Sequence, residues 1–384
     1  MLRVAIIGWN GRFNVGDDAM TCSLIKLINE QNKKVHFFIF SDKRGVSVFE
    51  RCNTNGVFSM VPYFNTLNNI RGFSNIINKL YLFPKYLKNI DILIFGGGAI
   101  FKNYKICNAK IKLIDYVSKH NPNVLIHGYS LTIGPYNSKN YNYCKKLISK
   151  FDTLSVRDSR SESIVRSFKG EDNCYRTYDF AMILPDLLKI NRSTPDNDTI
   201  GISLRSGHVD NKLIESIGSI VSSCIINDKN LNVYIFVFCM YDKQNDLFDA
   251  NNLLEKIKKT LAAKGRYIDR IKIINYNMDL SNFLESVERC SIIVAERLHA
   301  AVLGCSLNKP LIMLSYSQKC IDFAIEINLD RKYIFDINRI DYIEFSNSFN
   351  NCMRLYKNGR VNWHVDKNIV NNNIRQTFSR QFSL

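Results

Sequence analysis

The chain has 384 residues, with 52 Lys plus Arg against 35 Asp plus Glu, and a formal net charge of +17 at pH 7 with neutral histidines. Its hydrophobic fraction of 46% is sufficient to form hydrophobic cores. Together with 23% charged residues, this composition excludes a largely disordered, collagenous or coiled-coil protein. At about 150 residues per domain, this length favours two domains.

Apolar runs are no longer than a strand, and none reaches the about 18 residues that a membrane-spanning helix needs. The N-terminus runs directly into a buried-strand pattern and lacks the small-residue cleavage site of a signal peptide. Eleven cysteines are scattered singly, with no C-x-x-C spacing, which predicts reduced and mostly buried thiols. We therefore expect a cytoplasmic protein.

Short β-branched apolar runs alternate with helix-length amphipathic segments, which indicates repeated βαβ units and a mostly parallel sheet. In the first half, we predict strands at 3–8, 34–40, 90–95, 123–128, 153–157 and 174–178. Helices are predicted at 16–30, 106–119, 141–150 and 159–168, with a further, less regular helix inside 65–88.

The polar, turn-rich stretch 191–198 is typical of a linker. After it, we predict strands at 199–204, 232–238, 271–274, 291–295 and 310–314, and helices at 212–226, 245–263, 280–288, 297–305 and 320–327. The predicted fold class is α/β, with two Rossmann-like doubly wound domains facing across a cleft in the GT-B-like manner. The predicted parts are an N-terminal domain at 1–190, a C-terminal domain at 199–340, and a segment at 341–384 whose helix near 343–356 packs back on the first domain, with a mobile end.

Glycine-rich loops follow two of the first-domain strands. Gly8, Gly11 and Gly16 do not fit the dinucleotide fingerprint G-x-G-x-x-G, although the helix start near Gly16 can meet an anionic or hydroxyl-bearing ligand. Asp17 and Asp18 can either contact such a ligand or simply cap the helix. The triplet Gly96-Gly97-Gly98 ends a fully apolar strand, which favours a loop that faces a ligand.

Charged side chains follow other strands. Arg157 stands at a strand end beside a helix start, where its planar fork suits a phosphate or carboxylate, unless it forms a surface pair with Asp158. Asp179 stands where the first domain meets the linker. In the second domain, strand ends carry a further set of polar residues: Arg205, His208, Asp242, Gln244, Asp246, Tyr316 and Lys319.

The strongest local pattern is a buried strand that leads directly into a small-residue helix with Arg297 and His299 in its first turn. A lone histidine in an apolar run is usually structural, but an arginine two residues earlier at the edge of a sheet favours a functional role. The cations Arg157, Arg297 and Lys319 around one histidine predict a small, multiply anionic ligand.

The order of these motifs resembles that of the polysaccharide pyruvyl transferase family. The resemblance covers about residues 4–322 and rests on eight motifs in family order: Gly16-Asp17-Asp18, Gly96-Gly97-Gly98, Ile133-Gly134-Pro135, Ser155-Val156-Arg157-Asp158, Asp179-Phe180-Ala181, Ser203-Leu204-Arg205, Arg297-Leu298-His299 and the Lys319 region. Two motifs depart from the family pattern. The loop at 128–135 reads Gly-Tyr-Ser-Leu-Thr-Ile-Gly-Pro instead of Gly-Gln-Gly-Ile-Gly-Pro, and Asp179-Phe-Ala replaces Asp-Pro-Ala.

The resemblance implies transfer of the pyruvyl group of phosphoenolpyruvate to a sugar of a cell-surface polysaccharide or its precursor, with a pyruvate ketal and phosphate as products. It assigns phosphoenolpyruvate to Arg157, Arg205, Arg297 and Lys319, and catalysis to His299 with Arg297. A histidine exchanges protons near neutrality and suits general acid–base catalysis. It places the saccharide acceptor at six residues of the first domain: Gly16, Asp17, Asp18, Gly97, Gly98 and Asp179. Phosphoenolpyruvate serves as donor substrate, and no further cofactor or metal is expected.

Two other hypotheses remain open at this stage. A GT-B-type glycosyltransferase using a nucleotide sugar suits two Rossmann-like domains equally well. A basic surface-binding protein suits the +17 charge, which attracts anionic lipid or phosphate-rich chains. No nucleic-acid motif is present among the basic residues, so we expect no nucleic-acid partner. Peripheral association with the inner face of the membrane agrees with the leading hypothesis if the acceptor is lipid-linked.

Overall fold

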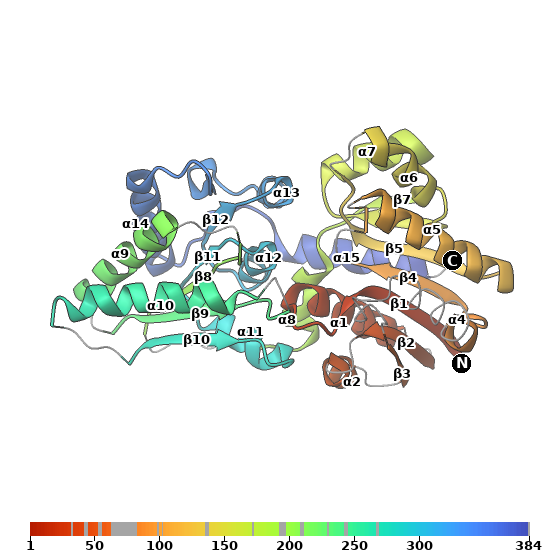
Figure 1. The fold of residues 1–384 in the computed structure, drawn as a ribbon, viewed down its shortest axis with the longest axis horizontal. Coiled ribbons are helices and arrows are strands. Elements are labelled where there is room, and N and C mark those ends of the chain that lie inside the picture. Colours follow the sequence, from red (N-terminus) through yellow and green to blue (C-terminus); the bar gives the residue numbers. More distant parts are fainter. Residues whose placement is uncertain are drawn as a thin grey trace. The chain divides into compact units, whose positions relative to one another are not determined.

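The computed structural model describes residues 1–31, 34–41, 45–52, 56–62, 83–97, 100–101, 103–134, 138–170, 173–191, 197–207, 211–228, 230–241, 245–265 and 269–382. The chain divides into two compact units (Figure 1). Unit 1 comprises Met1–Arg12, Asp17–Phe180 and Val370–Leu384, and unit 2 comprises Phe13–Gly16 and Ala181–Ile369.

Unit 1 is built on a seven-stranded parallel sheet with the strand order β3-β2-β1-β4-β5-β6-β7. Its strands are β1 (Leu2–Asn10), β2 (Val35–Ser41), β3 (Val57–Pro62), β4 (Ile92–Gly96), β5 (Leu125–Leu131), β6 (Thr153–Val156) and β7 (Cys174–Arg176). The helices are α1 (Val15–Glu30), which begins in unit 2, α2 (Val46–Cys52), α4 (Phe83–Leu87), α5 (Tyr104–His120), α6 (Ser138–Ile148) and α7 (Ser159–Lys169). The central strands are buried on both faces, which explains their almost continuous apolar sequences.

Unit 2 contains a six-stranded parallel sheet with the order β10-β9-β8-β11-β12-β13. Its strands are β8 (Thr199–Ser203), β9 (Asn232–Val237), β10 (Ile271–Asn275), β11 (Ile292–Ala295), β12 (Leu311–Ser315) and β13 (Ile334–Asp336). Its α-helices are α8 (Leu184–Leu187), α9 (Asn211–Asn227), α10 (Leu247–Ala262), α11 (Leu280–Glu288), α12 (Leu298–Ser306), α13 (Gln318–Glu326) and α14 (Tyr342–Lys357), and short 3-10 helices are η3 (Phe180–Ile183) and η5 (Arg331–Tyr333).

Both sheets follow the doubly wound order, in which the chain reverses direction next to the first strand of each sheet. The reversal lies between β1 and β4 in unit 1 and between β8 and β11 in unit 2. Ligands of open α/β sheets bind at the carboxyl ends of the strands that flank such a reversal. The predicted fold class of two Rossmann-like domains is confirmed by these two sheets.

The C-terminal segment corrects one part of the sequence analysis: its tail joins unit 1, as predicted, but its first helix does not. The helix expected near 343–356 to pack on the first domain is α14, which instead contacts β11 and β12 of unit 2. Where a mobile end was expected, the chain forms helix α15 (Lys367–Phe382), blue in Figure 1, which enters unit 1. Its Gln381 amide donates to the backbone carbonyl of Gly128 at 3.2 Å and to the Thr153 hydroxyl at 3.0 Å.

The cysteines provide a second correction, because Cys22 on α1 and Cys52 on α2 form a disulfide with a Cα–Cα distance of 5.7 Å. The other nine are free thiols, and all of these except Cys224 are buried. Most of the predicted linker, 192–196, and most of the irregular stretch, 63–82, lie outside the described residues. In the described part of the chain, no helix combines the length and apolar character required to cross a membrane.

Candidate active site

Four neighbouring strands at the centre of the unit 2 sheet, β9, β8, β11 and β12, end at the same edge. Asp246 and Arg205 lie in the loops after β9 and β8, and His299 and Lys319 lie in the first turns of α12 and α13, which follow β11 and β12. Parallel strands thus bring together residues that are more than 100 positions apart in the sequence. This edge includes the β8–β11 reversal, where a ligand is expected.

Arg297 lies directly at this reversal and is paired with Asp246. The Arg297 Nε donates to Asp246 Oδ2 at 2.9 Å, and the guanidinium makes a second contact with the same carboxylate. Asp246 also accepts hydrogen bonds from the backbone N–H groups of Cys239 at 3.0 Å and Ser206 at 3.1 Å. Although burial opposes its charge, Arg297 has a raised pKa because the Asp246 carboxylate stabilises the guanidinium. Asp246 therefore connects the loops after β8 and β9 and holds Arg297 in one position.

Glu296, the residue before Arg297, is fully buried. Its Oε2 accepts a hydrogen bond from the backbone N–H of Arg205 at 2.7 Å. Burial raises the pKa of Glu296 to about 8, despite opposing contributions from that hydrogen bond and from nearby arginines. The carboxyl group is consequently neutral in most molecules at pH 7. Sequence reasoning did not select Glu296, although it stands in the same motif as Arg297 and His299.

Arg205 and Lys319 both lie over the ring of Tyr316. The Arg205 Cζ is 4.4 Å from the ring centroid and the Lys319 Nζ is 5.2 Å from it. Such cation–π contacts orient a cation without neutralising its charge. The buried Nη1 of Arg205 has no hydrogen-bond partner among the described residues. A buried donor of this kind is suited to an anionic ligand oxygen.

His299 lies in the first turn of α12 and is packed against a segment from the start of the chain. The backbone N–H of Val15 donates to the carbonyl of Phe238, and the N–H of Met240 donates to the carbonyl of Phe13, both at 3.0 Å. This pairing places Gly16 against the imidazole, since a Cβ on Gly16 would lie 1.9 Å from His299 Nδ1. A glycine is thus required at position 16 for His299 to hold its present position. We had predicted that Gly16 would contact an acceptor.

Arg157, predicted to belong with these cations, is a residue of unit 1. Its Nε donates to Thr132 Oγ1 at 2.8 Å, and its guanidinium forms an ion pair with Asp179. The alternative pairing of Arg157 with Asp158 is wrong, because Asp158 caps α7 by accepting from the N–H of Ser161 at 2.7 Å. Arg157 and Asp179, predicted for donor and acceptor respectively, are therefore partners of each other.

The remaining predicted acceptor residues occupy loops of unit 1. Asp18 is fully buried and closes the turn after β1, because its Oδ1 accepts from the N–H of Gly11 at 2.6 Å. Asp17, in contrast, is half-buried at the start of α1. Gly97 has a φ of +64°, a conformation that favours glycine, directly after β4. Gly98 lies outside the described residues, as do Pro135, His208, Asp242 and Gln244.

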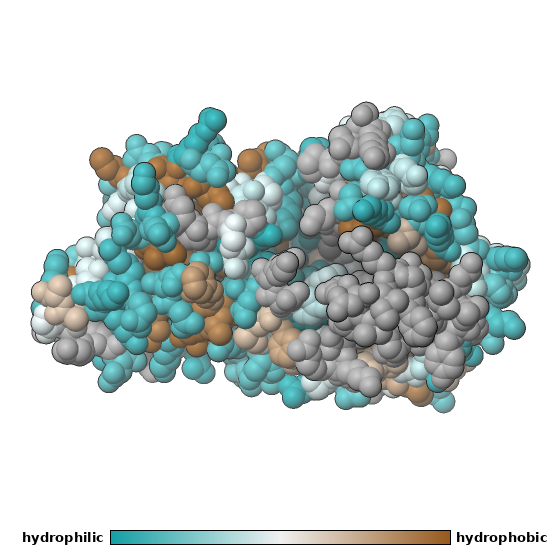
Figure 2. Space-filling view, viewed as in Figure 1, coloured by the Kyte–Doolittle hydropathy of each residue, from teal (hydrophilic) through white to brown (hydrophobic). Residues whose placement is uncertain are grey.

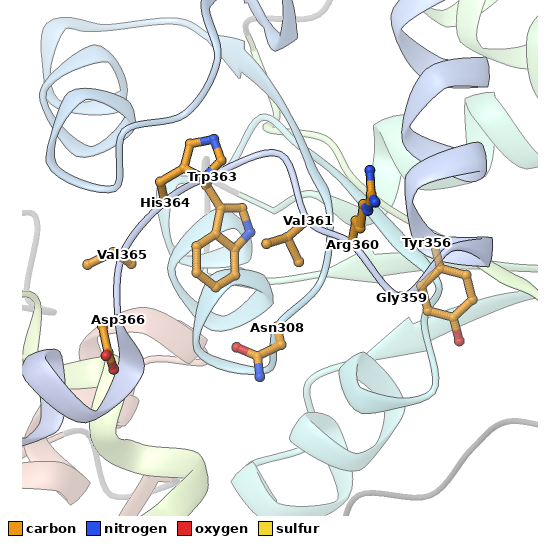
Figure 3. Close-up of a pocket in the computed structure, with 9 residues that line it drawn as sticks. All are labelled: Asn308, Tyr356, Gly359, Arg360, Val361, Trp363, His364, Val365 and Asp366. Carbon is orange, nitrogen blue, oxygen red and sulfur yellow. The ribbon is translucent and has the colours of Figure 1, made fainter.

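A cavity of about 590 Å³ lies elsewhere in unit 2. Figure 3 shows its lining residues at the end of α14 and along the segment that joins α14 to α15, together with Asn308 from the turn before β12. Asn308 precedes β12, so this cavity is at the amino edge of the sheet, opposite the edge that carries His299. No group of three or more potential metal ligands was found among the residues described here.

Comparison with protein families matches residues 14–318 to polysaccharide pyruvyl transferase. The chain belongs to the polysaccharide pyruvyl transferase family. It is thus a transferase, and the matched region contains every strand of the candidate active site in unit 2. The resemblance seen in the sequence motifs is confirmed. The sequence motifs select Arg205, Arg297, His299 and Lys319, and the strand ends also select Asp246, but they indicate neither the pairing of Asp246 with Arg297 nor Glu296.

Solved structures similar to this pyruvyl transferase family member include two UDP-GlcNAc 2-epimerases. The enzyme from Methanocaldococcus jannaschii has a TM-score of 0.67 at 12% identity, covering 100% of this chain and 99% of that one. The enzyme from Neisseria meningitidis, bound to UDP-GlcNAc, has a TM-score of 0.64 at 12% identity and covers 100% of both chains. A lipopolysaccharide outer core galactosyltransferase matches with a TM-score of 0.51 at 10% identity, covering 100% of this chain and 98% of that one. At these identities the likeness shows the GT-B-like fold alone.

One curated relative matches over a short stretch. Phosphoenolpyruvate carboxylase of Nitrosomonas eutropha is 28% identical over 90 residues, covering 20% of this chain. The chain spans only 10% of the length of that enzyme.

Proposed function

We propose that the protein transfers a pyruvyl group from phosphoenolpyruvate to a sugar of a cell-surface polysaccharide or its precursor, forming a pyruvate ketal and releasing phosphate. The observation that carries this proposal is the carboxyl edge of the unit 2 sheet, where Arg297 and His299 stand at the start of α12 and Arg205 follows β8. The buried Nη1 of Arg205 has no hydrogen-bond partner in the described part of the chain. Arg205 and Lys319, both oriented by Tyr316, supply two positive charges for a carboxylate and a phosphate. The short match to a phosphoenolpyruvate carboxylase is compatible with this donor.

The chemistry requires one group that moves protons. The methylene carbon C3 of the donor gains a proton and becomes a methyl group, while a sugar hydroxyl adds to C2. Cleavage of the bond between C2 and the phosphate oxygen then releases phosphate, and a second hydroxyl closes the ketal ring. The two hydroxyl protons balance the one gained by C3 and the one that leaves with phosphate. His299 is proposed as the acid and base for these transfers, with Arg297 stabilising the departing phosphate.

The acceptor is proposed to contact loops of unit 1. Gly97 and Asp17 follow the two strands that flank the reversal point of that sheet, and Gly97 has a φ of +64° there. Gly98, Asp18 and Asp179 remain in the proposal, and Asp18 and Asp179 act mainly through the loops that they stabilise. Arg157 remains a proposed donor residue whose role is tested separately below.

The test is to incubate the protein with phosphoenolpyruvate and candidate saccharides, free, nucleotide-linked and lipid-linked, and to identify the products by mass spectrometry. We expect equal amounts of phosphate and pyruvylated sugar. Phosphate release without a pyruvylated sugar would reject transfer. The second candidate, a nucleotide-sugar glycosyltransferase, is favoured by the GT-B-like fold. Thermal stabilisation by a nucleoside diphosphate sugar, with no response to phosphoenolpyruvate, would support that candidate instead.

A lysine-rich face of unit 1 supports peripheral association with an anionic membrane surface, consistent with a lipid-linked acceptor. Lys105, Lys112 and Lys119 recur every seven residues along α5, and Lys145 and Lys146 are on the adjacent α6. All five are exposed, and none forms an ion pair with a carboxylate in the described residues. The surface over α5–α7 is mainly hydrophilic in Figure 2. An exposed basic cluster of this size attracts anionic lipid by about 1 kcal/mol per residue near the surface.

Vesicle sedimentation tests this association. The protein should bind vesicles containing phosphatidylserine at low salt and leave them at high salt. Lys112→Glu with Lys145→Glu should weaken binding, whereas Lys258→Glu with Lys264→Glu, at exposed positions of unit 2, should not. Equal weakening by both pairs, or preferential binding to a DNA duplex, would contradict the proposal.

A further inference from the structure

Glu296 is a buried carboxyl group at the reversal point of the unit 2 sheet, and the chemistry proposed above does not use it. Its side chain has an exposed fraction of 0%. Oε2 accepts from the Arg205 N–H, while Oε1 has no hydrogen-bond partner among the described residues. An ionised carboxylate would leave a charged oxygen buried without a donor, whereas the protonated acid leaves only a neutral one. The geometry therefore favours the neutral acid.

The charged groups around Glu296 are directed elsewhere. Arg297, at the start of α12, is bonded to Asp246 at the start of α10. Arg205, from the loop after β8, bonds Glu296 only through its backbone, and its guanidinium lies over Tyr316. Arg205 and Arg297 favour ionisation of Glu296, Asp246 opposes it, and the Cys320 thiol on α13 also interacts with it. None of these interactions supplies a direct counter-ion.

This arrangement affects how Arg205 can bind an anion. A neutral Glu296 holds the backbone of Arg205 in place and leaves the full positive charge of the guanidinium for a ligand. An ionised Glu296 would place a negative charge behind Arg205 and Arg297 and would oppose any anion that they bind. The same hydrogen bond is available in both states, so the protonation of Glu296 changes charge rather than loop geometry.

We propose that Glu296, as a neutral acid, is a positioning residue for the anionic donor: it orients the Arg205 loop while sparing the guanidinium charge for a phosphate or carboxylate. The inference rests on the proposed function only in naming phosphoenolpyruvate as the physiological anion. Binding of inorganic phosphate tests it independently of transfer. A failure to transfer pyruvate would refute the function and leave this inference intact.

The experiment measures the Kd of inorganic phosphate, and separately of phosphoenolpyruvate, for the wild type and Glu296→Gln between pH 6.5 and pH 9.5. Glutamine is isosteric with the neutral acid and cannot ionise. The ratio of the two Kd values cancels titration of the ligand and of groups that both proteins share. We expect equal affinities at pH 7 and about tenfold weaker binding by the wild type at pH 9.5. Glu285→Gln, a half-buried glutamate on α11, should follow the wild type at every pH.

A ratio that does not change with pH would overturn the inference, as would loss of binding by Glu296→Gln at pH 7. Circular dichroism and thermal melting report whether the variant folds. Infrared difference spectroscopy keeps the inference testable on the wild type alone, through the carbonyl band of the buried acid. The pH at which this band disappears should rise with saturating phosphate, because coupling between proton and anion is reciprocal. A titration midpoint unaffected by phosphate would contradict the inference.

Discussion

Each unit buries one arginine–aspartate pair at the carboxyl edge of its sheet, but the two pairs occupy different places. Arg157 and Asp179 of unit 1 have side-chain exposures of 9% and 1%, and Arg297 and Asp246 of unit 2 have 11% and 1%. The unit 1 arginine follows β6, two strands beyond the reversal point, whereas Arg297 follows β11 directly at it. The same kind of pair thus stabilises a peripheral part of one sheet and the reversal point of the other.

The reversal points themselves also differ. In unit 1 they carry glycines, with Gly11 after β1 and Gly97 after β4, both at positive φ. In unit 2 the corresponding loops carry Arg205, Glu296 and Arg297. The glycines carry no charge, whereas the arginines of unit 2 suit a compact anion. The difference supports the proposal that the anionic donor binds to unit 2.

The largest effect is expected from His299, which is the proposed acid and base and has no proposed counterpart in unit 1. His299→Ala should lower the rate of pyruvyl transfer about 1000-fold, equivalent to about 4 kcal/mol, because it removes the proposed acid and base. The side chain is only half-buried, so the melting temperature should change little. Steady-state kinetics and thermal melting measure the two quantities, and near-normal transfer would exclude His299 from the mechanism.

Removing one carboxylate from each unit tests directly whether the two arginine–aspartate pairs have different roles. Asp246→Asn and Asp179→Asn should each lower the free energy of unfolding by about 3 kcal/mol, because each leaves a buried arginine without its partner. Denaturant unfolding measures this loss. Binding of phosphoenolpyruvate should weaken more in Asp246→Asn, because Asp246 holds the loops of the proposed donor site. Equal weakening in both variants would bring Arg157 into the donor site, as the sequence motifs predict.

Elements with strong apolar periodicity could be predicted from the sequence, and weakly periodic ones could not. The predicted strand at 291–295 and helix at 280–288 match β11 and α11 almost residue for residue. Helix α15 was missed because asparagines and charged residues dilute its apolar content. Its buried residues Val370, Ile374 and Phe378 nevertheless recur every four positions, which is the signal that could have indicated it. The short elements α2, β3 and β13 offered no comparable pattern.

The features of the candidate site also divide into those that the sequence predicts and those that it does not. Loops at the ends of predicted strands were sufficient to select Arg297 and His299. Their supporting contacts could not be predicted, because Asp246 is 51 positions from Arg297 and Glu296 is 91 positions from Arg205. Pairings at such separations depend on strand order rather than on any local spacing. The Gly16 contact with His299 joins residues still further apart.

Glu296 also predicts how stability depends on pH in unit 2. The Glu296 pKa is about 8 in the folded protein against 4.5 ordinarily. Below pH 4.5 the carboxyl is neutral in both states. Between pH 4.5 and pH 8 the unfolded chain loses the proton and the folded chain keeps it, so the free energy of unfolding falls as pH rises. Glu296→Gln removes this penalty and should be more stable than the wild type at pH 7 by roughly 2–3 kcal/mol.

Denaturant titrations at several pH values measure this difference. The stability of the variant relative to the wild type should grow from pH 5 to pH 8 and then remain constant. A variant that is less stable than the wild type throughout this range would show that Glu296 is ionised in the folded protein.

Gly16 differs from Gly11 and Gly97, because the absence of a side chain at this position makes room for the imidazole of His299. Gly16→Ala should displace His299, since the new Cβ would lie 1.9 Å from Nδ1 in its present position. The imidazole can rotate away, so the fold should survive while transfer slows by about 10- to 100-fold, the scale expected when a catalytic group moves by about 1 Å. Gly265→Ala is the control, because that glycine has a φ of +65° and no atom within 4 Å of a new Cβ. It should lower stability slightly without affecting transfer. If Gly16→Ala instead raises the KM for the saccharide and leaves kcat unchanged, Gly16 contacts the acceptor, as the sequence motifs first suggested.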